Sequence, residues 1–190
     1  RFRGCIATRF PVLDNAGRPF TSLGRSYRWL MYDRILVPTD GSSTAEVAFE
    51  HAVELATRYD AEIHALYVVD TDAMSIALGP EQVDRVLNGQ FEGMSEIRDK
   101  AEEAIDRVAA IAEESGVECH TEIRGGQPHR KIRDAIDDDG IDAVVMGSHG
   151  RSGLKRRIMG SVTERVLRST TVPVLVIDEK GQTEAENQVL

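Results

Sequence analysis

Glycines at a defined spacing are the residues of this sequence best suited to chemistry. Gly147 and Gly150 directly follow an apolar run, and nine residues separate Gly150 from Gly160, which Ser161 follows. Because glycines lack a Cβ atom, their backbone N–H groups can approach phosphate oxygens closely. A helix that begins at Ser161 adds unpaired N–H donors and the positive end of its dipole. The spacing predicts an anion site, although a glycine-rich turn beside a solvated, charged loop fits the same pattern.

Polar and basic side chains around these glycines favour the anion site. The hydroxyl groups of Ser161 and Thr163 fall in the first turn of the expected helix, where they can donate to an anion. His149 could touch a phosphate or could have only a surface role. The intervening loop carries four cations on an otherwise acidic sequence, namely Arg151, Lys155, Arg156 and Arg157.

The motifs of well-known catalytic classes are absent or incomplete. Residues 152–155 have the S-x-x-K spacing, but the S-D-N and K-T-G partners of that chemistry are missing. The sequence contains no G-x-S-x-G elbow, no P-loop and no G-x-G-x-x-G fingerprint. The five histidines form no i, i+4 pair and have no neighbouring cysteine, so no metal site is expected; they are His51, His64, His120, His129 and His149.

The elements that would position the glycines alternate along the chain. The pattern predicts strands at 35–37, 61–69, 117–123, 141–146 and 172–177; the run at 35–37 is continuously apolar and, like 141–146, is expected to be buried on both faces. Helical spacing of apolar residues predicts helices at 43–59, 81–115 with an interruption near 89–93, 128–138 and 161–168. Residues 70–80 are expected to form a loop. This order predicts an α/β fold, a three-layer α/β/α arrangement with a five-stranded parallel sheet.

Several local signals refine these bounds. Ser43 and Glu46 have the spacing of a capping box, which predicts that Ser43 caps the first helix. Residues 117–123 alternate between apolar and polar, which predicts a strand at or near an edge of the sheet. Two glycines at 125–126 predict a turn. Pro173 cannot donate to a ladder, so the last strand is either an edge strand or begins at Pro173.

The place where two loops meet is the expected ligand site. In open parallel sheets, ligands bind past the carboxyl ends of the strands where the strand order reverses. If the first and fourth strands are neighbours, residues 38–42 face the glycine loop. This puts Asp40 beside the crevice, where it could serve the site or could form an Asx turn or a helix cap.

The glycine segment and three others together resemble one family. Gly-x2-Gly-x9-Gly-Ser, preceded by Val145-Met146 and followed by Val162-Thr163, is similar to the ATP-binding motif of universal stress proteins. Residues 35–42, 67–70 and 172–177 resemble the first strand and loop, the end of the second strand and the last strand of that family. The resemblance spans about residues 33–178. The family that it indicates is part of the wider adenine nucleotide alpha hydrolase-like superfamily.

The resemblance implies a fold and a nucleotide site. It implies a Rossmann-like sheet of order 3-2-1-4-5, with phosphate and ribose at the glycines and at Ser161. The adenosine lies against the loop after the first strand, adenine contacts Val68, and Mg²⁺ is held through the phosphates. The implied ATP contacts are Pro38, Thr39, Asp40, Val68, Met146, Gly147, Gly150, Arg151, Gly160, Ser161, Val162 and Thr163.

Family members commonly dimerise, which implies a homodimer through the edge strand 172–177, with Val174 and Val176 at the contact. The expected function is nucleotide-dependent regulation in a stress response. No base is assigned for ATP hydrolysis, so turnover is at most slow. Two alternatives stay open: a nucleotide hydrolase or adenylyl-transferring enzyme that uses Asp40 or His149, and a chaperone-like interaction protein that needs no nucleotide.

Charge and composition exclude other classes. Residues 1–30 carry six Arg and one Asp, so the net charge of −9 leaves −14 on residues 31–190, which argues against nucleic-acid binding. No run approaches the roughly 18 apolar residues of a membrane span. Arg outnumbers Lys by 19 to 4, and this acidic, Lys-poor composition is typical of a halophilic source. Cys119 is expected to be a buried small hydrophobe in a reducing cytoplasm.

The ends of the chain differ from the domain between them. Residues 1–30 show neither strand nor helix periodicity, and they are expected to be a poorly ordered extension, with initiation at Met31. An Arg-rich targeting or anion-binding arm is the alternative. Residues 179–190 are polar and acidic and are expected to form a flexible tail, so the domain is predicted to span 31–178.

Overall fold

The fold is built around one parallel sheet. The structure is a computed structural model that describes residues 32–74, 79–91, 93–150 and 159–178, so the predicted extension and tail lie outside the described residues. Five strands pair in the order β3-β2-β1-β4-β5, and every pair is parallel. Their bounds are β1 Arg34–Thr39, β2 Glu62–Asp70, β3 Cys119–Gly126, β4 Ala143–Gly147 and β5 Val174–Ile177. The predicted α/β class and strand order are confirmed.

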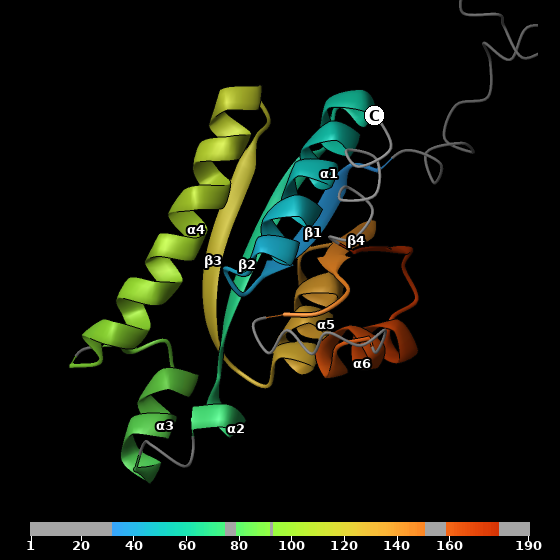
Figure 1. Cartoon of the computed structure of the whole chain (residues 1–190). Helices are drawn as coiled ribbons and strands as arrows, with labels where there is room; N and C mark the ends of the chain where they lie inside the picture. The colour runs from blue at the N-terminus through green and yellow to red at the C-terminus, as the bar shows by residue number, and fades with distance from the viewer. Residues whose placement is uncertain (1–31, 75–78, 92, 151–158, 179–190) are drawn as a thin grey trace, which may run out of the picture. The chain divides into compact units, whose positions relative to one another are not determined.

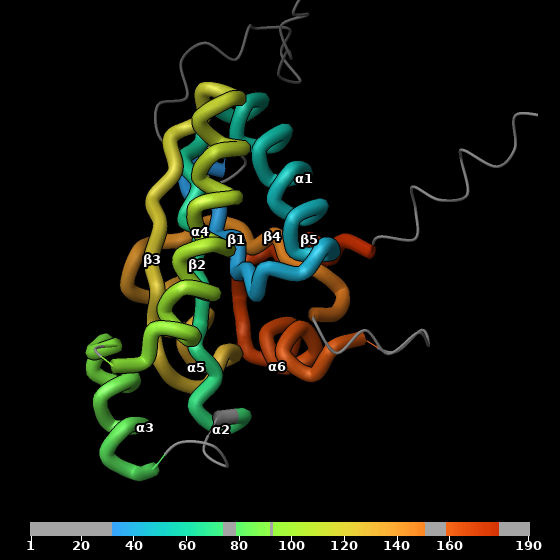
Figure 2. The backbone as a smooth tube through the Cα atoms, turned by 60° about the vertical axis from the view of Figure 1, so that its left-hand side comes forward, coloured from blue at the N-terminus to red at the C-terminus, as the bar shows by residue number. Residues whose placement is uncertain are grey.

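Helices cover both faces of the sheet, as Figures 1 and 2 show. Helices α1 (Ser43–Tyr59) and α4 (Ser95–Ser115) pack on one face, and α5 (Pro128–Asp138) and α6 (Ser161–Ser169) pack on the other. Successive residues of β1 enter different cores: Ile35 and Val37 join the first, and Leu36 joins the second. Because both faces of β1 are buried, its residues 35–37 form a continuous apolar run.

The connection after β2 contains helix where a loop is predicted. Helix α2 (Thr71–Met74) follows β2 directly, and the Asp70 carboxylate accepts hydrogen bonds from the backbone N–H groups of Asp72 and Ala73 at 3.0 and 3.2 Å. That short turn needs no apolar periodicity, so the pattern gives no sign of it. Helix α3 (Pro80–Leu87) then precedes α4, and the predicted interruption near 89–93 is confirmed.

The predicted turn at Gly125 and Gly126 is wrong, because both residues belong to β3. Gly125 pairs with Val69 of β2. A Cβ atom on Gly125 would overlap the backbone carbonyl group of Val86 in α3. The glycine therefore allows a helix to approach a strand closely, which is the other common use of glycine in a sheet.

The cap of α1 is one residue earlier than predicted. Ser42, not Ser43, is the N-cap: its Oγ accepts a hydrogen bond from the Ala45 N–H at 3.3 Å, and its carbonyl oxygen accepts from the Glu46 N–H at 3.0 Å. The Glu46 carboxylate pairs with Arg107 of α4 at 3.0 Å. With Ser42 as the N-cap, the third helical position is Ala45, so Glu46 is one residue too late for the predicted capping box and pairs with α4 instead.

The two edge strands agree with the sequence signals. Exposed side chains dominate the first half of β3, and β5 begins just after Pro173, two residues later than the predicted strand. Cys119 packs against the first core from β3, where burial raises its pKa to about 11. Within the described ranges no helix has the length and apolarity needed to cross a bilayer.

Candidate functional site

The strand order reverses between β1 and β4. The ladder between them joins Ile35 to Ala143 and Leu36 to Val144. Pro38 has no N–H group and lies beyond this ladder, towards the carboxyl end of β1. The sheet thus provides the switch point at which a ligand crevice is expected.

The loop after β1 is held by its own side chains. Thr39 Oγ1 accepts from the Gly41 N–H at 3.1 Å. Asp40 Oδ1 accepts from the Ser42 N–H at 3.1 Å and from the Ser42 hydroxyl at 2.6 Å. Asp40 thus forms an Asx turn, which is one of the roles that the sequence leaves open for it, and Gly41 completes the turn with a φ of 74° that favours glycine. These bonds fix the backbone on one side of the expected crevice.

The glycine loop after β4 lies against the loop after β1. A Cβ atom on Gly150 would overlap the Asp40 carboxylate. A Cβ atom on Gly147 would stand 3.0 Å from Cγ2 of Thr44, in the first turn of α1. The loops after β1 and β4 are therefore adjacent, and their approach depends on the missing side chains.

The start of α6 closes the same loop. Gly160 is the N-cap, and its N–H donates to the Ser148 carbonyl oxygen at 2.8 Å. Ser161 is exposed at the first position of α6, whereas Thr163 is buried and its hydroxyl donates to the Gly147 carbonyl oxygen at 2.9 Å. The helix dipole and the first N–H groups of α6 thus point towards the glycine loop, and Thr163 positions that loop.

Two contacts near His149 link the loop to its surroundings. The Ser148 hydroxyl and His149 Nδ1 lie 2.7 Å apart. The Ser148 N–H donates to the Ile177 carbonyl oxygen at 2.7 Å, so the loop is tied to the end of β5. Arg151 and the other predicted loop cations lie outside the described residues.

The predicted apolar contacts share one side of the sheet. Met146 is part of the second core, and Val68 and Val162 pack against that core from the ends of β2 and α6. Pro38 follows Leu36 by two positions, so it faces the same side. An apolar surface beside backbone N–H donors can bind a flat ring together with an anion.

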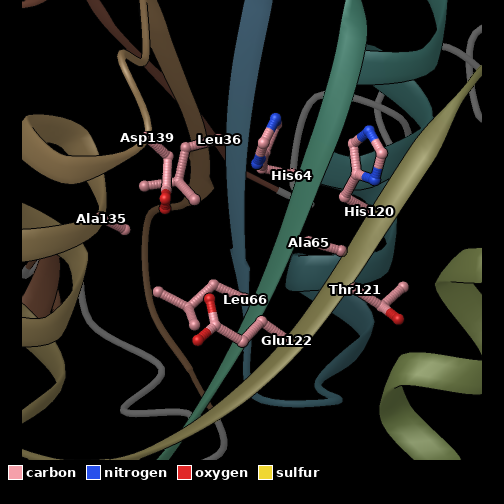
Figure 3. A pocket seen from close by; sticks show the side chains of 9 residues that line it. All are labelled: Leu36, His64, Ala65, Leu66, His120, Thr121, Glu122, Ala135 and Asp139. Carbon is pink, nitrogen blue, oxygen red and sulfur yellow. The ribbon is translucent and has the colours of Figure 1, made fainter.

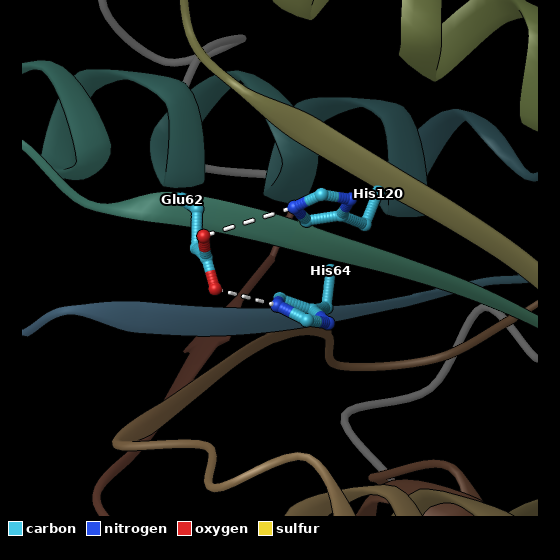
Figure 4. A group of neighbouring side chains, drawn as sticks. All are labelled: Glu62, His64 and His120. Atoms are coloured by element: carbon cyan, nitrogen blue, oxygen red, sulfur yellow. Dashed lines mark hydrogen bonds and ion pairs between the residues drawn. The ribbon is translucent and has the colours of Figure 1, made fainter.

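One cluster of polar side chains was missed by the sequence reasoning. Glu62 and His64 of β2 and His120 of β3 lie together (Figure 4). They belong to the amino ends of these strands, whereas the glycine loop follows the carboxyl end of β4. The register pairs His64 with His120. The only signal in the sequence is the alternation Glu62-x-His64 and Glu118-x-His120, which has no meaning until the strand register is known.

Sequence comparisons agree with this architecture. Residues 31–178 match the profile of the universal stress protein family. The chain is 38% identical over 148 residues to the universal stress protein MJ0531 of Methanocaldococcus jannaschii, covering 77% of this chain and 82% of that protein. It is 33% identical over 160 residues to MJ0577 of the same organism, covering 80% of this chain and 98% of that one.

Solved structures share the fold. The universal stress protein UspA of Lactobacillus plantarum superposes with a TM-score of 0.63 at 32% identity, covering 77% of this chain and 98% of UspA. More distant relatives, at 21–23% identity and TM-scores of 0.53–0.57, were solved with dAMP (Archaeoglobus fulgidus), AMP (Arabidopsis thaliana) and cAMP. The profile match over residues 31–178 and the identity with near full-length relatives mean that this chain belongs to the universal stress protein family.

Proposed function

We propose that this chain binds ATP, with Mg²⁺ held through the phosphates, in the crevice between the loops that follow β1 and β4. The observation that carries the proposal is the contact of the glycine loop with the Asp40 turn, where a side chain on Gly150 has no room. Glycines in such a loop let backbone N–H groups approach a phosphate closely, as phosphate binding requires. Binding of dAMP, AMP and cAMP by proteins of the same fold supports an adenine nucleotide.

The nucleotide would lie across the carboxyl ends of the strands. The phosphates would occupy the start of α6, near Gly160 and Ser161, where the helix dipole favours an anion. The adenosine would rest on the apolar side formed by Val68 and Met146. Asp40 would then face ribose hydroxyls, which can donate to a carboxylate, and would avoid the like charge of the phosphates.

The function would be regulatory. The glycine loop is hydrogen-bonded to β5 through Ser148 and Ile177, so a nucleotide that binds the loop also acts on the edge strand. Leu175 of β5 is 43% exposed. An exposed edge strand can pair with a second copy, and we propose a homodimer through residues 172–177 of a cytoplasmic protein.

Catalysis would be at most slow. Hydrolysis of ATP needs a group that positions the attacking water. The Asp40 Oδ1 atom already accepts two hydrogen bonds from Ser42, and His149 Nδ1 lies against the Ser148 hydroxyl. These engagements favour a binding module over an enzyme.

Nucleotide binding is tested on the purified full chain. Mass spectrometry of heat-released small molecules identifies any nucleotide that copurifies, and isothermal titration with Mg-ATP on the nucleotide-free protein gives the affinity. Gly160→Val should abolish the heat signal, because a Cβ atom there lies 3.2 Å from the His149 Cα and 3.3 Å from the Ser148 carbonyl oxygen, where larger branches crowd the loop.

The matched control is Gly79→Ala, at the N-cap of α3, where an added Cβ meets nothing closer than 4.0 Å. Circular dichroism should be native for both variants. Equal Mg-ATP affinity in Gly160→Val and in the wild type would refute the site. No binding of millimolar ATP by the wild type would favour a nucleotide-independent interaction protein.

A further inference from the structure

A second cluster of potential ligands lies at the end of the sheet opposite to the glycine loop. Glu62 and His64 are two residues apart on β2, so their side chains leave the same face. His120 of β3 is the register partner of His64 and joins them on that face. The two imidazole rings have centroids 5.1 Å apart.

The donor atoms of this cluster converge. His64 Nε2 lies 3.1 Å from Glu62 Oε1, and His120 Nε2 lies 3.7 Å from Glu62 Oε2. Figure 4 shows both rings directed at the one carboxylate. One donor atom from each of the three residues can be chosen so that all lie within 4.8 Å of one another.

These separations suit a bound transition-metal ion. Zn²⁺ forms bonds of about 2.0–2.2 Å in a tetrahedral site, which sets its ligand atoms about 3.4 Å apart. The donor atoms would have to move by about 1 Å to reach that geometry. Imidazole nitrogens with a carboxylate oxygen form the mixed set that Zn²⁺ binds, whereas Mg²⁺ and Ca²⁺ prefer oxygen ligands.

Neighbouring side chains hold the Glu62 carboxylate in position. Glu62 Oε1 accepts hydrogen bonds from His64 Nε2 at 3.1 Å and from Arg34 Nε at 2.7 Å. The Arg34 bond also orients the carboxylate, as partners outside the coordination sphere do in metal sites. Glu118, whose Oε1 lies 3.5 Å from His120 Nε2, adds a second negative charge beside the cluster.

A change of tautomer makes a histidine nitrogen available to the ion. Because a carboxylate only accepts hydrogen bonds, His64 Nε2 carries the ring proton in the contact with Glu62. In the other neutral tautomer the proton sits on Nδ1, and the Nε2 lone pair is available to a metal.

Space for a fourth ligand lies next to the histidines. His64 and His120 line one end of a cavity of about 190 Å³ that continues past Leu66 and Glu122 (Figure 3). Zinc sites with three protein ligands hold a water or a small ligand in the fourth position. The cavity is large enough for such a ligand.

We propose that Glu62, His64 and His120 form a binding site for Zn²⁺ or a similar divalent transition-metal ion, with an open coordination position towards this cavity. The site joins the edge strand β3 to β2 and is independent of the nucleotide crevice, because it lies at the amino ends of the strands. Bound metal would therefore hold the edge of the sheet in place.

The test uses the full chain freed of metal by a chelator and titrated with Zn²⁺ in the absence of nucleotide. The wild type should bind one Zn²⁺ at this site with a dissociation constant on the order of micromolar. His120→Ala and Glu62→Gln should each weaken that binding by about 10-fold or more. Zn²⁺ should also raise the melting temperature of the wild type and not that of His120→Ala.

His51→Ala is the matched control, since His51 is an exposed histidine on α1, and it should bind Zn²⁺ as the wild type does. Co²⁺ gives a second readout: the wild type should show the d–d bands of a nitrogen and oxygen site without a sulfur-to-cobalt charge-transfer band. Cys119 faces the first core from β3, so it cannot supply that band at this cluster.

Three results would overturn the proposal. The first is a wild type that binds Zn²⁺ more weakly than about 100 µM. The second is a Zn²⁺ affinity of His120→Ala and Glu62→Gln that equals the affinity of His51→Ala. The third is a thiolate band in the Co²⁺ spectrum. His120 is 53% exposed, so the loss of its ring is not expected to unfold the chain, and circular dichroism checks this.

Discussion

The Thr163 hydroxyl donates a hydrogen bond of 2.9 Å to the carbonyl oxygen of Gly147. Thr163 is buried in the first turn of α6, and Gly147 is the last residue of β4. The bond therefore joins the two ends of the glycine loop. A residue that sequence reasoning assigned to nucleotide contact has a positioning role that is visible without any nucleotide.

Thr163→Val should destabilise the protein, because valine keeps the shape of threonine but leaves the Gly147 carbonyl group without this donor. We expect a loss of about 1–3 kcal/mol in the free energy of unfolding, measured by urea denaturation. ATP affinity should fall as well, since the loop loses an anchor.

Ser169→Ala is the control for Thr163→Val. Ser169 lies in the same helix and donates to the Arg165 carbonyl oxygen at 2.8 Å, but at an exposed position. Its loss should change the free energy of unfolding by less than about 0.5 kcal/mol. If both variants behave alike, the Thr163 bond does not hold the loop.

Gly125→Ala should force α3 away from β3, because the new methyl group overlaps the Val86 carbonyl group. The expected cost is about 1–3 kcal/mol in the free energy of unfolding. Gly79→Ala, at the start of the same helix, has open space and should be nearly neutral. Equal stability of the two variants would contradict the close approach.

Leu175→Lys should convert the proposed dimer to a monomer, because a charge is placed on the edge strand that would pair with the second copy. Sedimentation velocity on the full chain measures the change. Leu167→Lys on α6 is the control, since Leu167 has a similar exposure of 39% against 43% for Leu175. A wild type that sediments as a monomer would rule out the dimer directly.

Glu62 should make stability depend on acid pH. Its folded-state pKa lies below the ordinary value of 4.5, first because of the hydrogen bond from His64. A lowered carboxyl pKa adds stability above the unfolded-state pKa, and that stability is lost as the pH falls through the folded-state pKa. The wild type should thus exceed Glu62→Gln in unfolding free energy at pH 7, and the difference should shrink at an acid pH below the folded-state pKa. A difference that is the same at both pH values would argue against the lowered pKa.

Cys119 should alkylate slowly in the native protein. Burial raises its pKa to about 11 from the ordinary 9.0, so at pH 8 its thiolate fraction is about 100-fold smaller than that of a free thiol. Mass spectrometry of iodoacetamide-treated protein should show little modified Cys119 until urea is added. Equal rates in native and unfolded chains would mean that this thiol is accessible.

The sheet and the glycine loop could be predicted because their signals are local. Residues 35–37 are buried on both faces and read as one apolar run, and Gly160 followed by Ser161 marks a helix start in the sequence itself. Strand order came from the resemblance to a family. It could not come from the elements alone, because right-handed crossovers still permit more than one order.

The features that were missed depend on partners far away in the sequence. In the sequence, Gly125 resembles a turn residue; its contact with Val86 of α3 is visible only in the structure. His64 and His120 are 56 positions apart and meet only through the register of β2 with β3. Spacing rules for metal ligands test neighbours along one element, so a ligand set divided between two strands escapes them.

The ladder between β1 and β4 has a consequence for how the molecule is held together. With two residue pairs in register, it is the shortest junction in the sheet, and it separates a block of three strands from a block of two. Any ligand that touches both the Asp40 turn and the start of α6 would span these blocks and add a link beside the shortest ladder. A ligand bound in the crevice would then make the sheet as a whole more rigid.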